Sequence, residues 1–179
     1  MSTQTVRELD EETVRATLRN RARELAKPAE THIRGAHLIE ILEFTLGPEH
    51  YAFPSSYVRE VFPLTEITPL PGLPGHVLGV VNVRGRILSV MDIRRLLEFP
   101  NVGLPNLNKA IILHAAEMEL AVLADEVTGV YVVDMDEGQT TLPTLSGNRE
   151  AYLQGVTKDR VVVLEAGKLL ASPDLLVRD

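Results

Sequence analysis

The chain has 179 residues, of which 45% are hydrophobic and 24% charged, so it can bury the core of one globular domain or of two small ones. It contains no cysteine, which excludes disulfides, a thiol nucleophile and thiolate metal sites. Aromatic residues make up 4% and the formal charge is -7, which disfavours the stacking and phosphate contacts of nucleic-acid binding. No apolar run approaches the roughly 18 residues of a membrane span and the N-terminus carries no signal-peptide core, so we expect a cytoplasmic protein.

The first 35 residues differ in charge from the rest of the chain. They carry seven Lys/Arg and six Asp/Glu, a net of +1, whereas residues 36–179 carry eleven against nineteen, a net of -8. We expect residues 1–35 to form an N-terminal extension with one amphipathic helix over residues 11–27, capped by Asp10 and stopped by Pro28. A narrow apolar stripe runs beside a basic row, so the helix could dock on its own domain, remain solvated, bind a partner or lie on a membrane surface. The stripe consists of Val14, Leu18, Ala22 and Leu25, and the row of Arg15, Arg19 and Arg23.

Short apolar runs cut by Gly and Pro follow Pro28 and predict a mostly β domain over residues 36–175. Helical turns are expected only at Ile93–Leu97 and Gly167–Leu170. The predicted strands are Leu38–Leu46, Tyr51–Pro54, Val58–Phe62, Val77–Val83, Ile87–Asp92, Ala110–Ala115, Leu120–Ala124, Val130–Asp134, Gln154–Thr157 and Val161–Glu165.

An internal repeat organises these strands. Residues 49–61 align without a gap onto residues 118–130, which places Ala52 on Ala121 and Val58 on Val127. A second pair of segments shows the same order of glycine, turn, strand and leucines. One begins at Gly79-Val80 and the other at Gly155-Val156, and matching positions are 73 to 76 residues apart. Two copies of about five strands each therefore account for residues 36–171, and we expect five such strands to close into a small barrel that removes their edges.

No pattern of residues indicates catalysis or a metal. The five histidines lack the i, i+4 spacing of a zinc site, and residues 134–138 open like a calcium loop, but its closing glutamate position is Leu145. Nucleophile-elbow and phosphate-loop motifs are absent. Asp92 or Asp125 could serve an acid-base hydrolase only if a cleft surrounded them. We therefore expect no enzyme, no metal and no cofactor.

The most distinctive segment, residues 79–97, is an apolar strand, an Arg-Gly turn and a second apolar strand that ends in Asp-Ile-Arg. Gly85 suits the positive φ of a tight hairpin turn. Asp92 is expected to pair with Arg94 or Arg84. For Arg84 two interpretations stay open: a turn cation without further role, or a functional residue.

This segment resembles the signature hairpin of the CheW family, the scaffold proteins of bacterial chemotaxis. The pattern of the family's hairpin is Gly, a short β run, Arg-Gly, an apolar strand and Asp-Leu-Arg. The resemblance extends over about residues 36–175 and implies a mostly β fold of two five-stranded SH3-like barrels side by side. Further segments that resemble the family lie at residues 44–46, 51–52, 58–61, 125–127 and 152–156.

The resemblance also implies a function. The family couples transmembrane chemoreceptors to the CheA histidine kinase without catalysis, so the expected partners are the regulatory domain of a CheA-type kinase and the cytoplasmic tips of methyl-accepting chemoreceptors. A hydrophobic groove between the barrels would take the receptor tip. Neither nucleic acid nor membrane insertion is implied, and the cytoplasmic protein would be recruited to membrane-associated receptor arrays. Carried over by position, the partner-facing residues are Val58, Glu60, Thr68, Gly79 and Arg84.

Three departures from the family pattern leave the identity of the partner open, and the first is the N-terminal helix, which the minimal pattern lacks. Leu120-Ala121 stands where the family has an apolar-Gly pair, and a Pro-rich connection occupies residues 69–75. The alternative function is a small-barrel module that binds nucleic acid or peptide outside chemotaxis.

Overall fold

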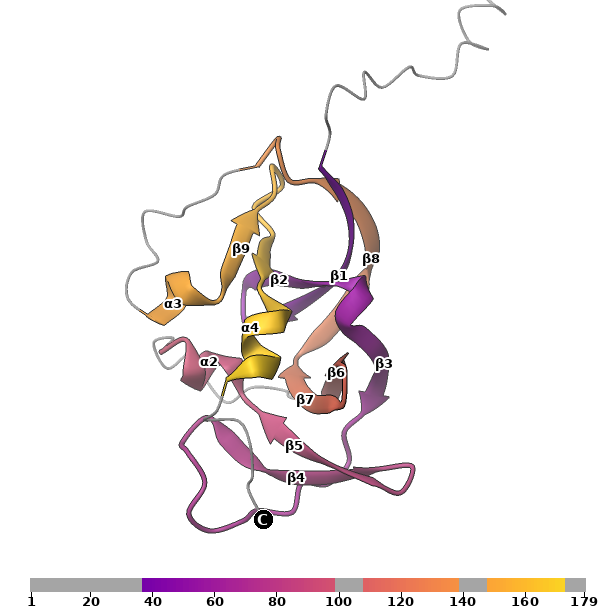
Figure 1. The fold of residues 1–179 in the computed structure, drawn as a ribbon, viewed down its shortest axis with the longest axis vertical. Helices are drawn as coiled ribbons and strands as arrows, with labels where there is room; N and C mark the ends of the chain where they lie inside the picture. Colours follow the sequence, from indigo (N-terminus) through magenta and orange to yellow (C-terminus); the bar gives the residue numbers. More distant parts are fainter. Residues whose placement is uncertain (1–36, 99–107, 139–147, 173–179) are drawn as a thin grey trace, which may run out of the picture. The chain divides into compact units, whose positions relative to one another are not determined.

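The computed structural model describes residues 37–98, 108–138 and 148–172, all of which belong to one compact unit, residues 36–179. The helix expected over residues 11–27 lies outside the described residues. Figure 1 shows the described chain as a set of short, curved strands with a few brief helices.

Two five-stranded sheets contain all the named strands. The first sheet has the order β8-β1-β2-β10-β9 and the second the order β3-β6-β7-β5-β4. Neighbouring strands are antiparallel, except that β10 runs parallel to β2 and β5 parallel to β7. The strands are β1 (Leu38–Leu46), β2 (Glu49–Pro54), β3 (Val58–Pro63), β4 (Val77–Val83), β5 (Arg86–Met91), β6 (Lys109–Ala115), β7 (Met118–Ala124), β8 (Glu126–Asp134), β9 (Leu153–Val156) and β10 (Val162–Leu164).

Each sheet coils into an open, SH3-like barrel, as the resemblance implied. We call them the first and the second barrel. In the second, an isolated bridge pairs Thr68, beyond the end of β3, with Val80 of β4, so the two edges of that sheet approach each other. The helical elements are η1 (Ser55–Tyr57), α2 (Ile93–Leu96), α3 (Asn148–Ala151) and α4 (Ala166–Ala171).

Strand pairing confirms the internal repeat residue by residue. Val58 of β3 pairs with Leu113, and its repeat mate Val127 of β8 pairs with Phe44, the mate of Leu113. The two parallel strand pairs also match. Val90 of β5 pairs with Ala121 of β7, and Val163 of β10 pairs with Ala52 of β2, the repeat mate of Ala121. The repeat therefore extends to register as well as to sequence.

The expectation that each copy forms its own barrel is wrong. The first barrel takes β1 and β2 from the first copy and β8, β9 and β10 from the second, and the second barrel takes the remaining strands. The connections explain the exchange: only Asp125 separates β7 from β8, and one residue cannot reverse a chain as a hairpin of two or more loop residues does. The chain bends there and runs on into the other sheet.

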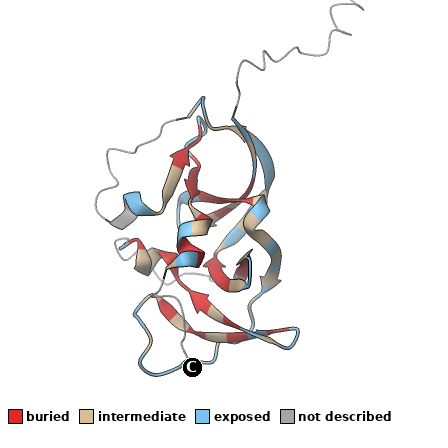
Figure 2. Cartoon of the chain, in the orientation of Figure 1, coloured by how far each residue is buried: buried red, intermediate tan, exposed pale blue. Residues whose placement is uncertain are grey.

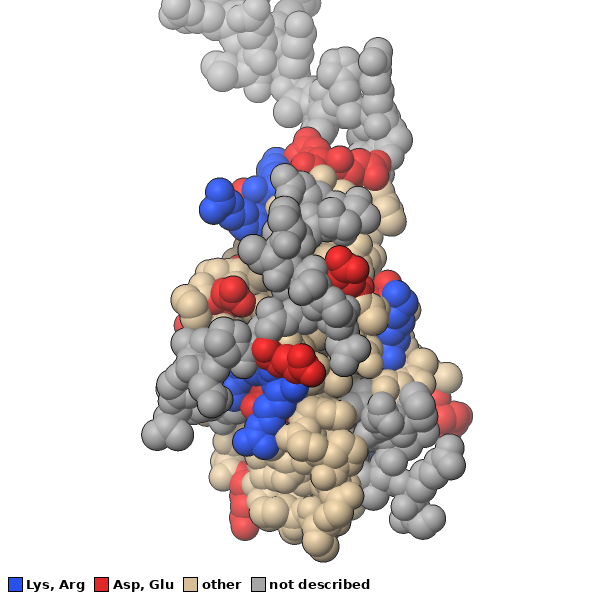
Figure 3. All heavy atoms as spheres, turned by 90° about the vertical axis from the view of Figure 1, so that its left-hand side faces the viewer, with Lys and Arg blue, Asp and Glu red and all other residues tan. Residues whose placement is uncertain are grey.

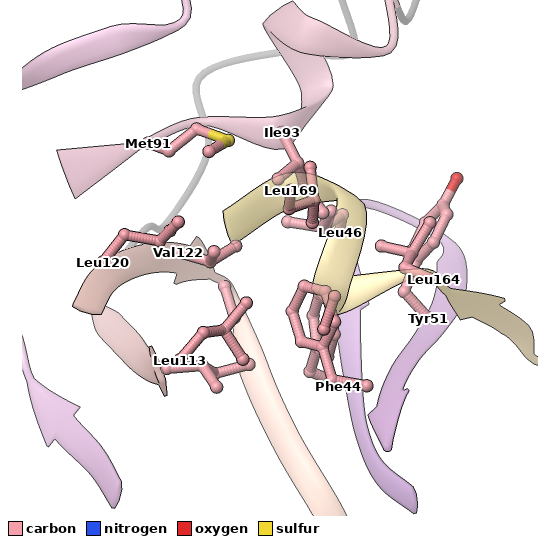
Figure 4. Close-up of a cluster of buried hydrophobic side chains, with 14 of the residues drawn as sticks. Phe44, Leu46, Tyr51, Met91, Ile93, Leu113, Leu120, Val122, Leu164 and Leu169 are labelled. Carbon is pink, nitrogen blue, oxygen red and sulfur yellow. The ribbon is translucent and has the colours of Figure 1, made fainter. Parts of the chain in front are cut away.

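The largest core cluster lies between the two sheets, where side chains from both meet around α4 (Figure 4). Phe44 of β1 and Phe53 of β2 stack there with ring centroids 5.1 Å apart, and Leu113 of β6 and Leu169 of α4 belong to the same cluster. Each sheet also has a smaller cluster of its own. The central strands are therefore buried on both faces, which accounts for their nearly continuous apolar sequences. The smaller clusters are Val81, Val83, Leu88, Val90, Ala110, Ile112, Ala121 and Leu123 in the second barrel, and Ile41, Ala52, Val161 and Val163 in the first.

All ten predicted strands and both helical turns are confirmed, with one large error in bounds. The strand expected from Val130 begins at Glu126, because Glu126, Val127 and Gly129 pair with β1 although glycine has low strand propensity. The elements η1 and α3 were not predicted.

Candidate functional site

The hairpin singled out by the sequence joins β4 to β5 through the two residues Arg84 and Gly85. Both have positive φ, 53° and 85°, as the tight primed turns of hairpins require. The amide of Gly85 donates a hydrogen bond of 2.8 Å to Oδ1 of Asn82. This turn presents the side chain of Arg84 to solvent, where 75% of it is exposed.

Arg84 belongs to a chain of ion pairs that crosses three strands. Its guanidinium lies 3.1 Å from Oε2 of Glu60 on β3, and the guanidinium of Arg86 on β5 lies 3.3 Å from Oε1 of the same carboxylate. Arg86 also donates to Glu119 on β7, and Arg59 contacts that carboxylate with 2.7 Å between Nε and Oε1. Because Glu60 and Glu119 are mostly buried, at 20% and 15% exposure, the network is held more firmly than isolated surface pairs.

Strand alternation explains why these charges meet. Phe62, Leu88 and Ala121 belong to or pack against the core cluster of the second barrel, and Glu60, Arg86 and Glu119 stand two positions before them. Since successive side chains of a strand point to opposite faces, residues two apart share a face. Glu60, Arg86 and Glu119 therefore lie on the inner face of the second barrel, at the end where its apolar core stops. We call this end the mouth of the second barrel.

Thr68 and Gly79 meet directly on the adjoining side of this barrel. The amides of Thr68 and Val80 each donate to the carbonyl of the other, both at 2.9 Å. Gly79 is buried and has a φ of 147°, and a Cβ at this position would lie 2.2 Å from the carbonyl oxygen of Thr68. A glycine is thus required for Thr68, which is exposed, to lie against β4.

Val58 faces a different core from Glu60, although only Arg59 separates them. Val58 is half-buried against the inter-sheet cluster, whereas Phe62 packs against the cluster of the second barrel. The cause is a β-bulge: Val58 pairs with Leu113 and Glu60 with the preceding residue of β6, so Arg59 is an extra residue that reverses the alternation. Val58 therefore connects to the charged network only through the backbone of β3.

Asp92 pairs with Arg94, one of the two partners predicted for it, and Arg84 pairs with Glu60 instead. The Asp92 carboxylate is buried and caps α2: its Oδ1 accepts from the amide of Arg94 at 3.0 Å and from its Nε at 2.9 Å. Its Oδ2 accepts from Nη2 of Arg94 at 2.8 Å. These hydrogen bonds raise the pKa of Arg94 above its ordinary value, against the opposing effect of burial.

The other polar candidates have structural partners. Oδ2 of Asp125 accepts a hydrogen bond of 2.6 Å from the amide of Gly47, which ties the crossover into β8 to the β1–β2 turn. In the acidic loop after β8, Glu137 pairs with Lys158 at 2.9 Å. Among the described residues there is no cluster of three or more His, Asp or Glu side chains suited to a metal ion. None of the helices in the described ranges is long and apolar enough to cross a membrane.

Sequence reasoning missed three members of the network, Arg59, Arg86 and Glu119. Arg59 and Arg86 lie within the quoted motifs, but only the approach of β3, β5 and β7 at the barrel mouth shows that they share carboxylates. For Glu119 the repeat offers no signal, because its mate in the first copy is His50.

The two barrels share one core, and the second carries an ordered network of charged side chains at its mouth. A family model described as "CheW-like domain" matches residues 40–174. The chain therefore belongs to the CheW-like family, the non-catalytic scaffold proteins of chemotaxis signalling that couple chemoreceptors to the kinase CheA.

Individual relatives agree with this assignment. The chain is 24% identical over 143 residues to "Chemotaxis protein CheW" of Treponema pallidum, covering 76% of this chain and 84% of the relative. It is 29% identical over 113 residues to "Protein PilI" of Pseudomonas aeruginosa, with 63% and 64% covered. The fold matches the crystal structure of the scaffolding protein TtCheW from Thermoanaerobacter tengcongensis with a TM-score of 0.61 at 23% identity, over 70% of this chain and 88% of that one.

Proposed function

We propose that this chain binds the regulatory domain of a CheA-type histidine kinase and the cytoplasmic tips of methyl-accepting chemoreceptors, and is recruited from the cytoplasm to membrane-associated receptor arrays. Family membership over residues 40–174 supports the proposal. The net charge of -7 gives no support to the nucleic-acid alternative, because phosphate contacts need cationic side chains.

We place the contact surface at the mouth of the second barrel, where Glu60 and Arg84 lie. Thr68 and Gly79 extend it on the adjoining side, and Val58 joins it through the backbone of β3. The observation that carries this placement is the state of Arg84, whose side chain is 75% exposed and yet paired at 3.1 Å with a mostly buried carboxylate. Such an arginine is already oriented before a partner arrives, so less side-chain entropy is lost on binding. Its remaining donors suit a carboxylate or backbone carbonyl of the partner.

The Arg84→Ala variant tests the placement. We expect binding to the kinase regulatory domain or to a receptor-tip fragment to weaken at least tenfold, measured by titration calorimetry with each purified partner. The free energy of unfolding should change by no more than about 0.5 kcal/mol, because the side chain is largely solvated. The matched control is Lys158→Ala, which removes another solvated cation from an ion pair, that with Glu137, and should leave both affinities unchanged.

Two results would reject parts of the proposal. If the unmodified chain binds neither partner at tens of micromolar, the coupling function is wrong. If Arg84→Ala loses several kcal/mol of stability, Arg84 is a structural residue and the placement of the surface is wrong.

A further inference from the structure

The two barrels end in equivalent edge strands with different protection. In natural sheets an edge strand is usually guarded by charges, proline or a bulge, because its free backbone groups can pair with another chain. The second barrel ends at β3, which carries the ion-paired Arg59 and Glu60 and the exposed Pro63. The first barrel ends at β8, where the mates of Arg59 and Glu60 are the uncharged Thr128 and Gly129.

Apolar side chains are exposed along β8, beyond the bulge at Thr128 that corresponds to the bulge of β3. Val130, Tyr131 and Val132 are 53%, 46% and 66% exposed, and Leu38, on the neighbouring strand β1, is 52% exposed. One edge of β8 is paired with β1 along its length, and no strand in the described ranges pairs with the other edge. Figure 2 shows β8 mostly in the colours of exposed and intermediate residues, in contrast to the buried strands beside the core.

Acidic residues stand at both ends of the apolar run. Glu126 begins β8, and Asp134, Asp136 and Glu137 lie at and beyond its end. Figure 3 shows acidic side chains, next to a group of basic ones, at the upper end of the described chain, the end at which β1 begins and β8 finishes in Figure 1.

These charges argue against a second copy of the chain as the occupant. In an antiparallel pair of β8 strands centred on Val130, Glu126 of one copy would face Asp134 of the other. Centred on Tyr131, it would face Asp136. Like charges directly opposite each other destabilise a strand pair, and the net charge of -7 on each copy adds to the repulsion.

We propose that the free edge of β8 binds an extended segment of a partner protein by strand addition. The segment has apolar side chains at alternate positions, to cover Val130 and Val132, and Lys or Arg at both ends, opposite the acidic residues. Main-chain hydrogen bonds supply the affinity in this mode and the alternate side chains supply the specificity. This surface lies on the first barrel and is separate from the contact surface proposed at the mouth of the second.

A matched pair of synthetic peptides tests the proposal on the full chain. The probe carries three valines alternating with threonines between two Lys pairs, and its control has Glu pairs instead. By fluorescence anisotropy we expect the Lys peptide to bind at least tenfold more tightly, with an affinity that falls as salt rises. Hydrogen exchange of the β8 amides that do not bond to β1 should be fast in the free chain and slow in the complex.

Two variants locate the binding. Val132→Lys should weaken the Lys peptide at least tenfold, whereas Ile87→Lys, at a position that is 63% exposed on the other sheet, should leave its affinity unchanged. Both positions are solvated, so the melting temperature serves as a check that each variant folds.

Four results would overturn the proposal. The first is equal binding of the two peptides, and the second is binding that Val132→Lys does not affect. Slow exchange of the outward β8 amides in the dilute free chain would show that a segment of the chain itself covers the edge. Exchange that slows with protein concentration alone would assign the edge to a second copy.

Discussion

Gly79 illustrates how one residue determines the position of another that the sequence places eleven positions away. Thr68 lies outside the named strands, and it reaches β4 only because Gly79 presents no side chain to the Thr68 carbonyl. Gly79 itself is buried. Its effect on the proposed contact surface is therefore to let the backbone of Thr68 approach β4.

The Gly79→Ala variant should break this contact. A Cβ 2.2 Å from the Thr68 oxygen forces the backbone apart, and the positive φ adds strain, so we expect a loss of at least about 2 kcal/mol in urea unfolding. The control is Gly85→Ala, where φ is also positive but no atom lies within 4 Å of the added Cβ, and the loss should be about 1 kcal/mol. Equal losses would mean that backbone strain alone, without the steric clash, explains Gly79.

Among the described residues, Asp92 is the buried charged side chain. Its side chain is 4% exposed and satisfies three donors of Arg94, itself 18% exposed. Removing the carboxylate leaves a mostly buried guanidinium without its partner and α2 without its cap.

We therefore expect Asp92→Ala to lose about 3 kcal/mol of unfolding free energy, in the range for one-sided removal of a buried ion pair. Glu137→Ala, which breaks an exposed pair, should lose at most about 1 kcal/mol in the same denaturation assay. Because the pKa of Arg94 is raised by folding, the stability from its protonation is present below the ordinary pKa and disappears only as pH rises through the raised one. The difference between Asp92→Ala and the unmodified chain should thus persist into alkaline solution; a difference that vanishes by pH 9 would contradict this account.

At the scale of elements, β-bulges let single strands serve two cores. Without the extra residue in β3, Val58 and Phe62 would face the same side; with it, Val58 packs between the sheets and Phe62 against the second barrel's own cluster. The shift in β4 between Val77 and Gly79 does the same for Val77 and Val81. Alternation in the sequence could not show these reversals, since all four residues are apolar.

The N-terminal helix proposed over residues 11–27 yields a prediction at this scale. Its apolar stripe is too narrow to offset the entropy of ordering the segment by docking alone. Deleting residues 1–30 should therefore leave folded barrels with nearly the same melting temperature, while self-association or the choice of kinase or receptor partner changes with loss of the basic row. A truncated chain that fails to fold, or that is destabilised by more than about 3 kcal/mol, would assign the helix to the core.

For the whole molecule, the exchange of the last three strands of each copy makes the two copies interdependent. Each barrel draws strands from both copies, and the strands at their junction bury both faces. A copy on its own would leave β1 and β2, or β6 and β7, with apolar faces in water and no sheet to complete.

Expressed separately, residues 36–102 and 103–179 should each lack cooperative thermal unfolding and the dispersed amide spectrum of a folded domain. Mixing them from denaturant should restore both properties, because the missing strands are supplied by the other fragment. A fragment that unfolds cooperatively alone would show that one copy can close its own barrel and that the exchange is not required for folding.

The sequence by itself determined the local elements, the repeat and the positive-φ turn at Gly85. The ordered motifs of residues 36–175 also indicated that the chain belongs to the CheW-like family. Each depends on neighbours along the chain, such as alternation, glycine at a tight turn and the capping aspartate before α2. Only the tertiary structure decided which copy completes which barrel and which charges share a carboxylate. Glu60, Arg86 and Glu119 are distant in sequence, and their contact results from the coiling of a sheet whose strand order no local pattern encodes.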